Sequence, residues 1–169
     1  MPSFRGLTFA LGGALRPVPP DRLEAAEAAL GCRFPDDYRD FVQVFGPGAF
    51  HGGVPRVFGP AYIARRTEED RARLREYWFW DASPEVWSQA RAVESVMCFD
   101  SAGGDDVRFH PDEPNTVYVL PRDDERIYRV SGFAELVSCL IRLYHDEEPD
   151  LGVFEPFRDR PDDPASRYD

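Results

Sequence analysis

Residues 30–48 read Leu-Gly-Cys-Arg-Phe-Pro-Asp-Asp-Tyr-Arg-Asp-Phe-Val-Gln-Val-Phe-Gly-Pro-Gly, and this stretch decides the fold. Gly31 favours the left-handed conformation that ends a helix. Pro35 suits the first turn of a second helix, because its φ is already fixed near the helical value. Apolar side chains then recur at helical spacing, as a stripe that we expect to face the core: Tyr38, Phe41, Val42 and Phe45. The stretch therefore predicts a corner between two helices.

The composition is typical of a globular chain with a strong negative charge. Of the 169 residues, 43% are hydrophobic and 14% aromatic, which is too apolar for a disordered chain. No apolar run approaches the ~20 residues that span a bilayer. The formal charge of −11 argues against nucleic-acid binding and is compatible with a basic protein partner. We expect a cytoplasmic protein that binds neither nucleic acid nor membrane.

Three cysteines cannot all pair with one another. Cys98 and Cys139 lie within apolar runs, which predicts buried free thiols. Free thiols are typical of a reducing compartment, in agreement with a cytoplasmic location.

Three further helices are expected, each with a capping residue. Asp21 would cap the helix that precedes the corner, with Glu24 completing a capping box. Thr67 would cap a charged helix over residues 68–77. Ser131 would cap a last helix, whose apolar residues follow a 3.6-residue period.

Short strands with tight turns fill much of the remaining chain. Residues 1–18 read as a loose lead-in with one short strand. Gly52-Gly53 indicates a hairpin. Pro55 lies in the second apolar run of this hairpin, so that run is expected to be an edge strand or the start of a strand. Residues 93–130 predict an antiparallel meander, in which residues 107–110 alternate inward and outward.

These elements predict an α+β fold, a mainly meander antiparallel sheet packed by helices on one side. We expect residues 1–169 to form a single domain, with a core over about 20–145. Residues 146–169 form an acidic, proline-rich extension, whose apolar residues (Leu151, Val153, Phe154 and Phe157) are expected to dock in part.

An aromatic run and two acidic turns are the candidate partner-binding residues. Aromatic residues over 77–80 cannot all face one side of an extended segment, so some are expected to be exposed, as interface anchors often are. The acidic turns would supply carboxylates to a basic partner, although Asp is also a common turn residue that is merely solvated. The candidates are Tyr77, Trp78, Trp80, Asp100, Asp105, Asp106, Asp123, Asp124 and Glu125.

A metal-dependent or acid–base enzyme is a remote alternative, built on the first acidic turn with His110. The turn does not follow an EF-hand pattern, and no nucleophile triad, P-loop or HExxH motif is present. His51 has no second ligand at a suitable spacing. We therefore expect no catalytic residue, no metal and no cofactor.

The order of these motifs resembles the SUKH superfamily, which includes the fungal Smi/Knr-type regulator and many bacterial immunity proteins. The resemblance covers roughly residues 20–145 and rests on Glu27, Leu30, Phe34, Pro35, Tyr38, Phe41, Gly46, Gly104, Asp105, Val107, Val117, Tyr118, Ser131, Phe133 and Leu136. Two features depart from the family pattern, a phenylalanine at position 34 where leucine is commoner and the arginine-rich helix with its tryptophan patch.

The resemblance implies a non-catalytic α+β domain that binds other proteins. In bacteria, the implied role is an immunity protein that neutralises a cognate secreted toxin, often a nuclease or nucleic-acid deaminase. A regulatory scaffold that binds a host protein is the alternative. The sequence leaves the oligomeric state open.

Overall fold

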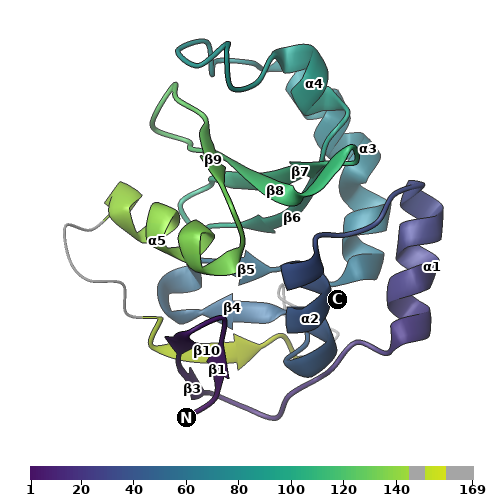
Figure 1. Cartoon of the computed structure of the whole chain (residues 1–169), viewed down its shortest axis with the longest axis vertical. Helices are drawn as coiled ribbons and strands as arrows, with labels where there is room; N and C mark the ends of the chain where they lie inside the picture. Colours follow the sequence, from purple (N-terminus) through teal and green to yellow (C-terminus); the bar gives the residue numbers. More distant parts are fainter. Residues whose placement is uncertain (145–150, 159–169) are drawn as a thin grey trace.

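A large mixed sheet forms the centre of the computed structural model, which describes residues 1–144 and 151–158 (Figure 1). Within these residues eight strands pair in the order β3-β10-β4-β5-β6-β7-β8-β9. They are β3 (Ala10–Leu11), β4 (Gly48–Phe50), β5 (Arg56–Val57), β6 (Val96–Asp100), β7 (Asp106–His110), β8 (Glu113–Leu120), β9 (Tyr128–Val130) and β10 (Val153–Pro156). All neighbours are antiparallel except β3 and β10, which are parallel.

The pairing confirms the predicted meander, which runs from β6 to β9. The hairpin at Gly52-Gly53 is confirmed too, as β4 and β5 joined by a short 3-10 turn, His51–Gly53. Pro55 directly precedes β5, which lies inside the sheet, so the strand-start interpretation is the correct one. The prediction that residues 1–18 form a loose lead-in with one short strand was wrong. Strands β1 (Ser3–Phe4) and β2 (Leu7–Thr8) form a second small sheet, and β3 joins the large one.

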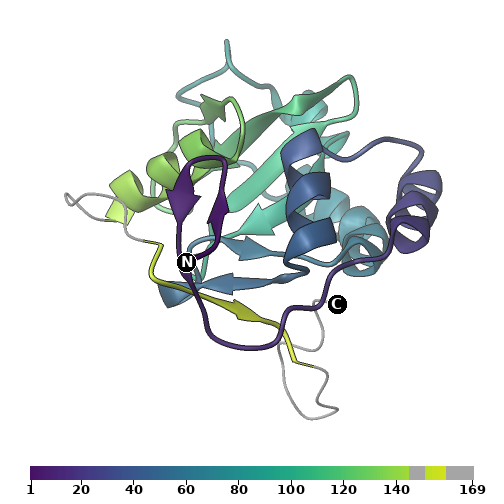
Figure 2. The ribbon, with the colours of Figure 1, turned by 60° about the horizontal axis from the view of Figure 1, so that its bottom comes forward.

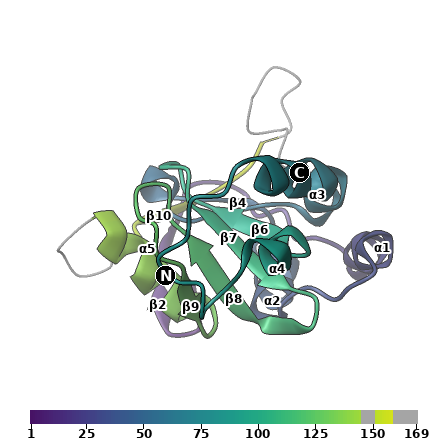
Figure 3. The ribbon, with the colours of Figure 1, turned by 90° about the horizontal axis from the view of Figure 1, so that it is seen from above.

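Helices cover both faces of the sheet, as Figures 2 and 3 show. They are α1 (Pro20–Leu30), α2 (Asp36–Val44), α3 (Pro60–Glu76), α4 (Gln89–Val93) and α5 (Phe133–Tyr144). Residues of β8 alternate between two apolar clusters. Val117 and Val119 pack with α2 and α5, whereas Tyr118 and Leu120 pack with the second half of α3 and with α4. The α+β class is confirmed, but the expectation of helices on one side was wrong.

The predicted corner between α1 and α2 is confirmed. Gly31 ends α1 with a φ of 69°, and the stripe from Tyr38 to Phe45 is buried. Phe41 stacks on Phe133 of α5, with ring centroids 5.1 Å apart. Gly46 ends the corner with a φ of 80°, and a Cβ there would lie 2.0 Å from the carbonyl oxygen of Arg16. Only glycine fits at this position, which therefore fixes the lead-in against α2.

The three predicted caps were wrong. Pro19 is the N-cap residue of α1, so Asp21 lies inside the helix and forms no capping box with Glu24. Its carboxylate accepts only the amide of the next residue, Arg22, at 2.9 Å. Helix α3 begins at Pro60, and Thr67 lies inside it, where its hydroxyl donates to the carbonyl of Ile63 at 2.7 Å. Ser131 is exposed, and the first amide of α5 is capped from another helix.

Residues 151–158 dock as predicted. Strand β10 lies between β3 and β4, and it buries Phe154 completely, while Leu151 and Phe157 are buried on either side of it. Val153 is only half-buried. The parts of the predicted extension at 146–150 and 159–169 lie outside the described residues.

Strand β7 is buried on both faces, so the expected alternation over residues 107–110 was wrong. Arg108 is fully buried, because α3 covers the face that would otherwise reach water. Its Nε donates to Ser95 Oγ at 2.7 Å and its Nη1 to Asp106 at 3.2 Å. Burial lowers the pKa of this guanidinium and raises that of nearby Asp70.

Candidate protein-binding surface

An extended aromatic segment leaves the end of α3 at Tyr77. The side chains of Tyr77 and Phe79 are 63% and 42% exposed, whereas Trp80 is 4% exposed and Trp78 lies between these extremes. The alternation follows from the extended backbone, which sends successive side chains to opposite sides. Phe79 stacks on Trp80, with ring centroids 4.0 Å apart. The exposed ring of Phe79 is therefore supported by the buried ring of Trp80.

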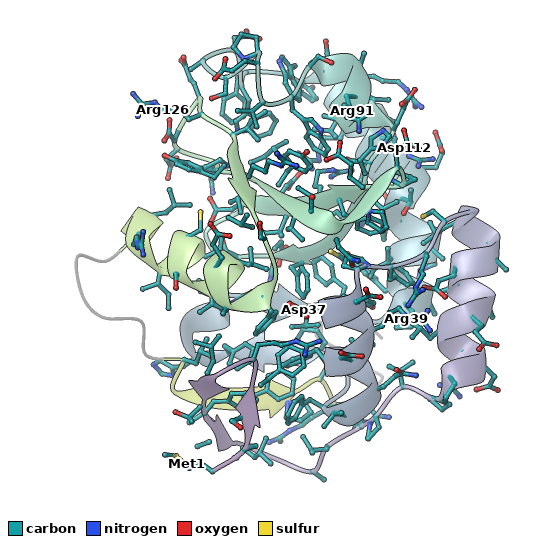
Figure 4. All side chains as sticks on the ribbon, viewed as in Figure 1. Met1, Asp37, Arg39, Arg91, Asp112 and Arg126 are labelled. Atoms are coloured by element: carbon teal, nitrogen blue, oxygen red, sulfur yellow. The ribbon has the colours of Figure 1, made fainter. Side chains whose placement is uncertain are left out.

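Hydrogen bonds join this segment to the β8–β9 turn, the turn whose tip carries Arg126 in Figure 4. The indole Nε1 of Trp80 donates to the carbonyl of Pro121 at 2.7 Å. The amide of Ile127 donates to Ser83 Oγ at 3.3 Å. The fold thus brings together two predicted sets of residues that are more than forty positions apart in the chain.

The β8–β9 turn presents carboxylates beside the exposed rings. Asp123 and Glu125 are exposed. Asp124 is half-buried and shapes the turn, since its carboxylate accepts the Tyr128 hydroxyl at 2.6 Å and the Arg126 amide at 3.0 Å. The hydrogen bond from Tyr128 is the main cause that lowers the pKa of Asp124. Asp124 is therefore a residue that shapes the turn, through its bonds to Tyr128 and Arg126.

Two residues that the sequence-based set lacked also lie on this surface. Phe79 is exposed beside Tyr77, and Asp81 is exposed and accepts the indole Nε1 of Trp78 at 2.9 Å. The period of two in an extended chain would have placed Phe79 on the same side as Tyr77. We define the aromatic–acidic surface as Tyr77, Trp78, Phe79, Asp81, Asp123 and Glu125.

The carboxylates of the β6–β7 turn face the interior instead. Asp105 is fully buried, where it accepts the hydroxyl of Ser101 and, at 3.0 Å, the amide of Arg122. Asp106 pairs with Arg73 and Arg108. The roles of Asp105, Asp106 and buried Trp80 are therefore structural. We leave all three out of the aromatic–acidic surface.

Asp100 is paired with Arg56, whose Nε donates to the carboxylate at 2.6 Å. Burial raises the pKa of Asp100 to about 6, and this effect outweighs the opposing influence of Arg56. The side chain is 14% exposed, so it offers little area to a partner.

The groups proposed for the remote enzyme alternative do not form a reactive site. His110 is buried, its Nδ1 accepts the amide of Asp112 at 3.1 Å, and its Nε2 lies 3.3 Å from Glu94. Among residues 1–144 and 151–158, no group of three or more His, Cys, Asp or Glu could hold a metal ion. None of the helices described there is long and apolar enough to cross a membrane.

Comparison with known proteins supports the resemblance inferred from the motifs. A search of curated proteins found no match. The family model described as "SMI1 / KNR4 family (SUKH-1)" matches residues 17–139, which is most of the chain and includes α1, the corner, the meander and the first half of α5. The chain therefore belongs to the SMI1/KNR4 family, SUKH-1.

Proposed function

We propose that this chain is a non-catalytic immunity protein, which binds and neutralises a cognate secreted toxin of the nuclease or nucleic-acid deaminase type. The SUKH family is generally non-catalytic and is known for immunity-like proteins. The single observation that carries the proposal is the pair of exposed rings, Tyr77 and Phe79, held beside an acidic turn.

Aromatic side chains are the usual centre of a protein interface, because they bury a large area at a small cost in conformational entropy. Phe79 is already ordered by Trp80, on which it stacks, and this reduces the cost of binding further. The two rings are thus suited to form the apolar centre of a contact.

The charge supports a basic partner. A toxin that acts on nucleic acid needs a basic substrate cleft, since phosphates dominate the affinity for nucleic acid. The chain carries a formal charge of −11. Asp81, Asp123 and Glu125 are exposed on the aromatic segment and on the turn that Trp80 joins to it. Complementary charge of this kind speeds association and favours the correct partner.

The proposal is tested by expressing the chain together with the toxin domain encoded next to its gene. The expected result is rescue of growth and a complex that survives size-exclusion chromatography. A toxin that arrests growth equally with and without the chain, and that forms no complex with it, would contradict the proposal.

A regulatory scaffold that binds a host protein is the second candidate, because the superfamily that the chain resembles includes the fungal Smi/Knr-type regulator. Gene context separates the two. A large secreted protein with a variable C-terminal domain encoded just upstream favours the immunity role, and its absence favours the scaffold.

A further inference from the structure

Arginine side chains of this protein lie over aromatic rings and pair with carboxylates at the same time. The guanidinium of Arg5 is 5.3 Å from the ring centre of Phe4, and its Nε donates to Asp37 at 2.7 Å. The guanidinium of Arg66 is 5.7 Å from the ring centre of Tyr62 and pairs with two carboxylates of α3. A planar guanidinium can do both, because its face stacks on a ring while its edge donates to a carboxylate. A ring beside a carboxylate therefore suits an arginine.

The aromatic segment presents a ring and a carboxylate of this kind at the protein surface. Phe79 uses one face of its ring to stack on Trp80, so the exposed part of this side chain, 42%, lies on the other face and at the edge. Asp81 accepts the indole Nε1 of Trp78 with Oδ1, at 2.9 Å, and its Oδ2 has no partner among residues 1–144 and 151–158. Because two residues span at most about 7 Å of backbone, the ring of Phe79 and the carboxylate of Asp81 are within reach of one side chain.

The chain does not supply an arginine to these groups from the part that the structure describes. Within that part, no guanidinium lies over Phe79, and none pairs with Asp81 or with Asp123 and Glu125 of the neighbouring turn. Residues 76–85 contain three carboxylates and no basic residue. A cation from another molecule would therefore meet no competing arginine of these residues.

The proposed toxin partner is basic, and we propose that Phe79 and Asp81 hold one of its arginine side chains; this step rests on the proposed function. The guanidinium would stack on the open face of Phe79 and donate to Oδ2 of Asp81. A lysine would gain less, since a compact ammonium is best held by a cage of rings, and Phe79 and Trp80 lie too close together, at 4.0 Å, to enclose one. Asp123 and Glu125 would draw the cation toward the surface.

The test is a nuclear magnetic resonance titration of the full chain with two peptides of equal charge. One is a heptapeptide with three arginines separated by glycines, and the other carries lysines at the same positions. The arginine peptide should bind about three to five times more tightly, because only its guanidinium gains the full stacking contact. The amide signals of residues 77–81 should shift on binding.

Three variants separate the ring from the charge. Phe79→Leu keeps an apolar side chain but removes the aromatic face, and it should bring the two Kd values to within about 1.5-fold of each other. Asp81→Asn keeps the acceptor for Trp78 but removes the charge, and it should weaken both peptides about twofold or more. Asp21→Asn is the matched control, since it removes the same charge from an exposed position on α1 and should change neither Kd by more than about 1.5-fold.

The amide signals of β6 to β8 report in every variant whether the sheet is folded. Equal Kd values for the two peptides, no binding of either, an arginine preference that persists in folded Phe79→Leu, or unchanged binding in folded Asp81→Asn would overturn the proposal. The toxin experiment fails or succeeds separately. A chain that neutralises the toxin but binds both peptides equally keeps the immunity role and loses the arginine site, whereas an arginine preference without neutralisation keeps the site and loses the toxin.

Discussion

The carboxylate of Asp37 on α2 caps α5, because its Oδ2 accepts the amide of Phe133 at 2.8 Å (Figure 4). Its other oxygen accepts Arg5 Nε at 2.7 Å, which ties the β1–β2 hairpin to the same point. The first amide of α2 is capped in turn by Asn115 of β8, at 2.8 Å. Both α2 and α5 thus obtain their caps from elements distant in the sequence, and these two caps fix how the elements meet.

Replacing Asp37 by alanine should lower the free energy of unfolding by about 1–2 kcal/mol, the usual value of a helix cap. Asp37→Asn keeps an acceptor and should cost less. Urea unfolding measures both. The control is Asp40→Ala, which removes a more exposed partner of Arg5 and should cost less than about 0.5 kcal/mol. Equal losses for Asp37→Ala and Asp40→Ala would refute the capping role.

Two substitutions at the corner separate packing from hydrogen bonding. Phe41→Ala should cost about 3–5 kcal/mol, because it leaves a cavity among the rings of Phe45, Phe50 and Phe133. Tyr38→Phe should cost about 1–3 kcal/mol, because it leaves the buried carbonyl of Phe58 without its donor at 2.7 Å. Thermal and urea unfolding provide both values. If either variant kept its stability and lost its partner, the corner would be functional and not structural.

Asp100 should make stability depend on pH. Burial raises the folded-state pKa of its carboxyl from 3.8 to about 6. Between about pH 4 and 6 the folded state therefore binds more protons than the unfolded state, and the free energy of unfolding falls as the pH rises. The stability of the wild type relative to Asp100→Asn should thus decrease by about 2 kcal/mol across this window. Asp21→Asn, at an exposed carboxylate, is the control. A difference that stays constant from pH 4 to 7 would count against the buried, raised pKa.

The cysteines should react slowly in the folded protein. They are free, and Cys98 is buried as predicted, whereas Cys139 is only half-buried and not buried as expected. Burial raises the pKa of Cys139 to about 11 and that of Cys98 further. Since the thiolate is the nucleophile, iodoacetamide at pH 8 should alkylate Cys139 about 100-fold more slowly than a thiol with the ordinary pKa of 9.0. Urea should make all three reactive. Rapid labelling of the folded chain, followed by mass spectrometry, would show that the thiols are accessible.

Local signals in the sequence predicted the corner between α1 and α2 but not the caps of the helices. Gly31 acts on the backbone at its own position, so the end of α1 could be predicted without knowledge of any distant contact. Pro35 was expected in the first turn of α2, but it lies at the N-cap, one residue before the helix begins. The caps could not be predicted, because Asp37 and Phe133 meet only once the sheet has brought α2 and α5 together. Thr67 has the composition of a cap but lies within a helix that Pro60 begins earlier.

The candidate surface was also predictable only in part, because the burial of some of its predicted residues depends on distant contacts. Tyr77, Trp78, Asp123 and Glu125 lie where a basic partner could reach them. Asp105 and Arg108 are polar residues in or beside a strand that two helix layers cover, and only the tertiary arrangement reveals this burial. The exposure of Phe79 could have been inferred from the alternation of an extended segment.

In the proposed complex, Tyr77 and Phe79 anchor the toxin beside the acidic turn. Isothermal titration of the neighbouring toxin domain tests it most directly, with the double variant Tyr77→Ala/Phe79→Ala against Leu11→Ala/Val44→Ala, which removes exposed apolar side chains elsewhere. We expect a Kd about 10–100-fold higher for the first variant, from about 1.4–2.7 kcal/mol of lost contact, and an unchanged Kd for the second. Equal Kd values for the wild type and a folded Tyr77→Ala/Phe79→Ala variant would contradict this anchoring role.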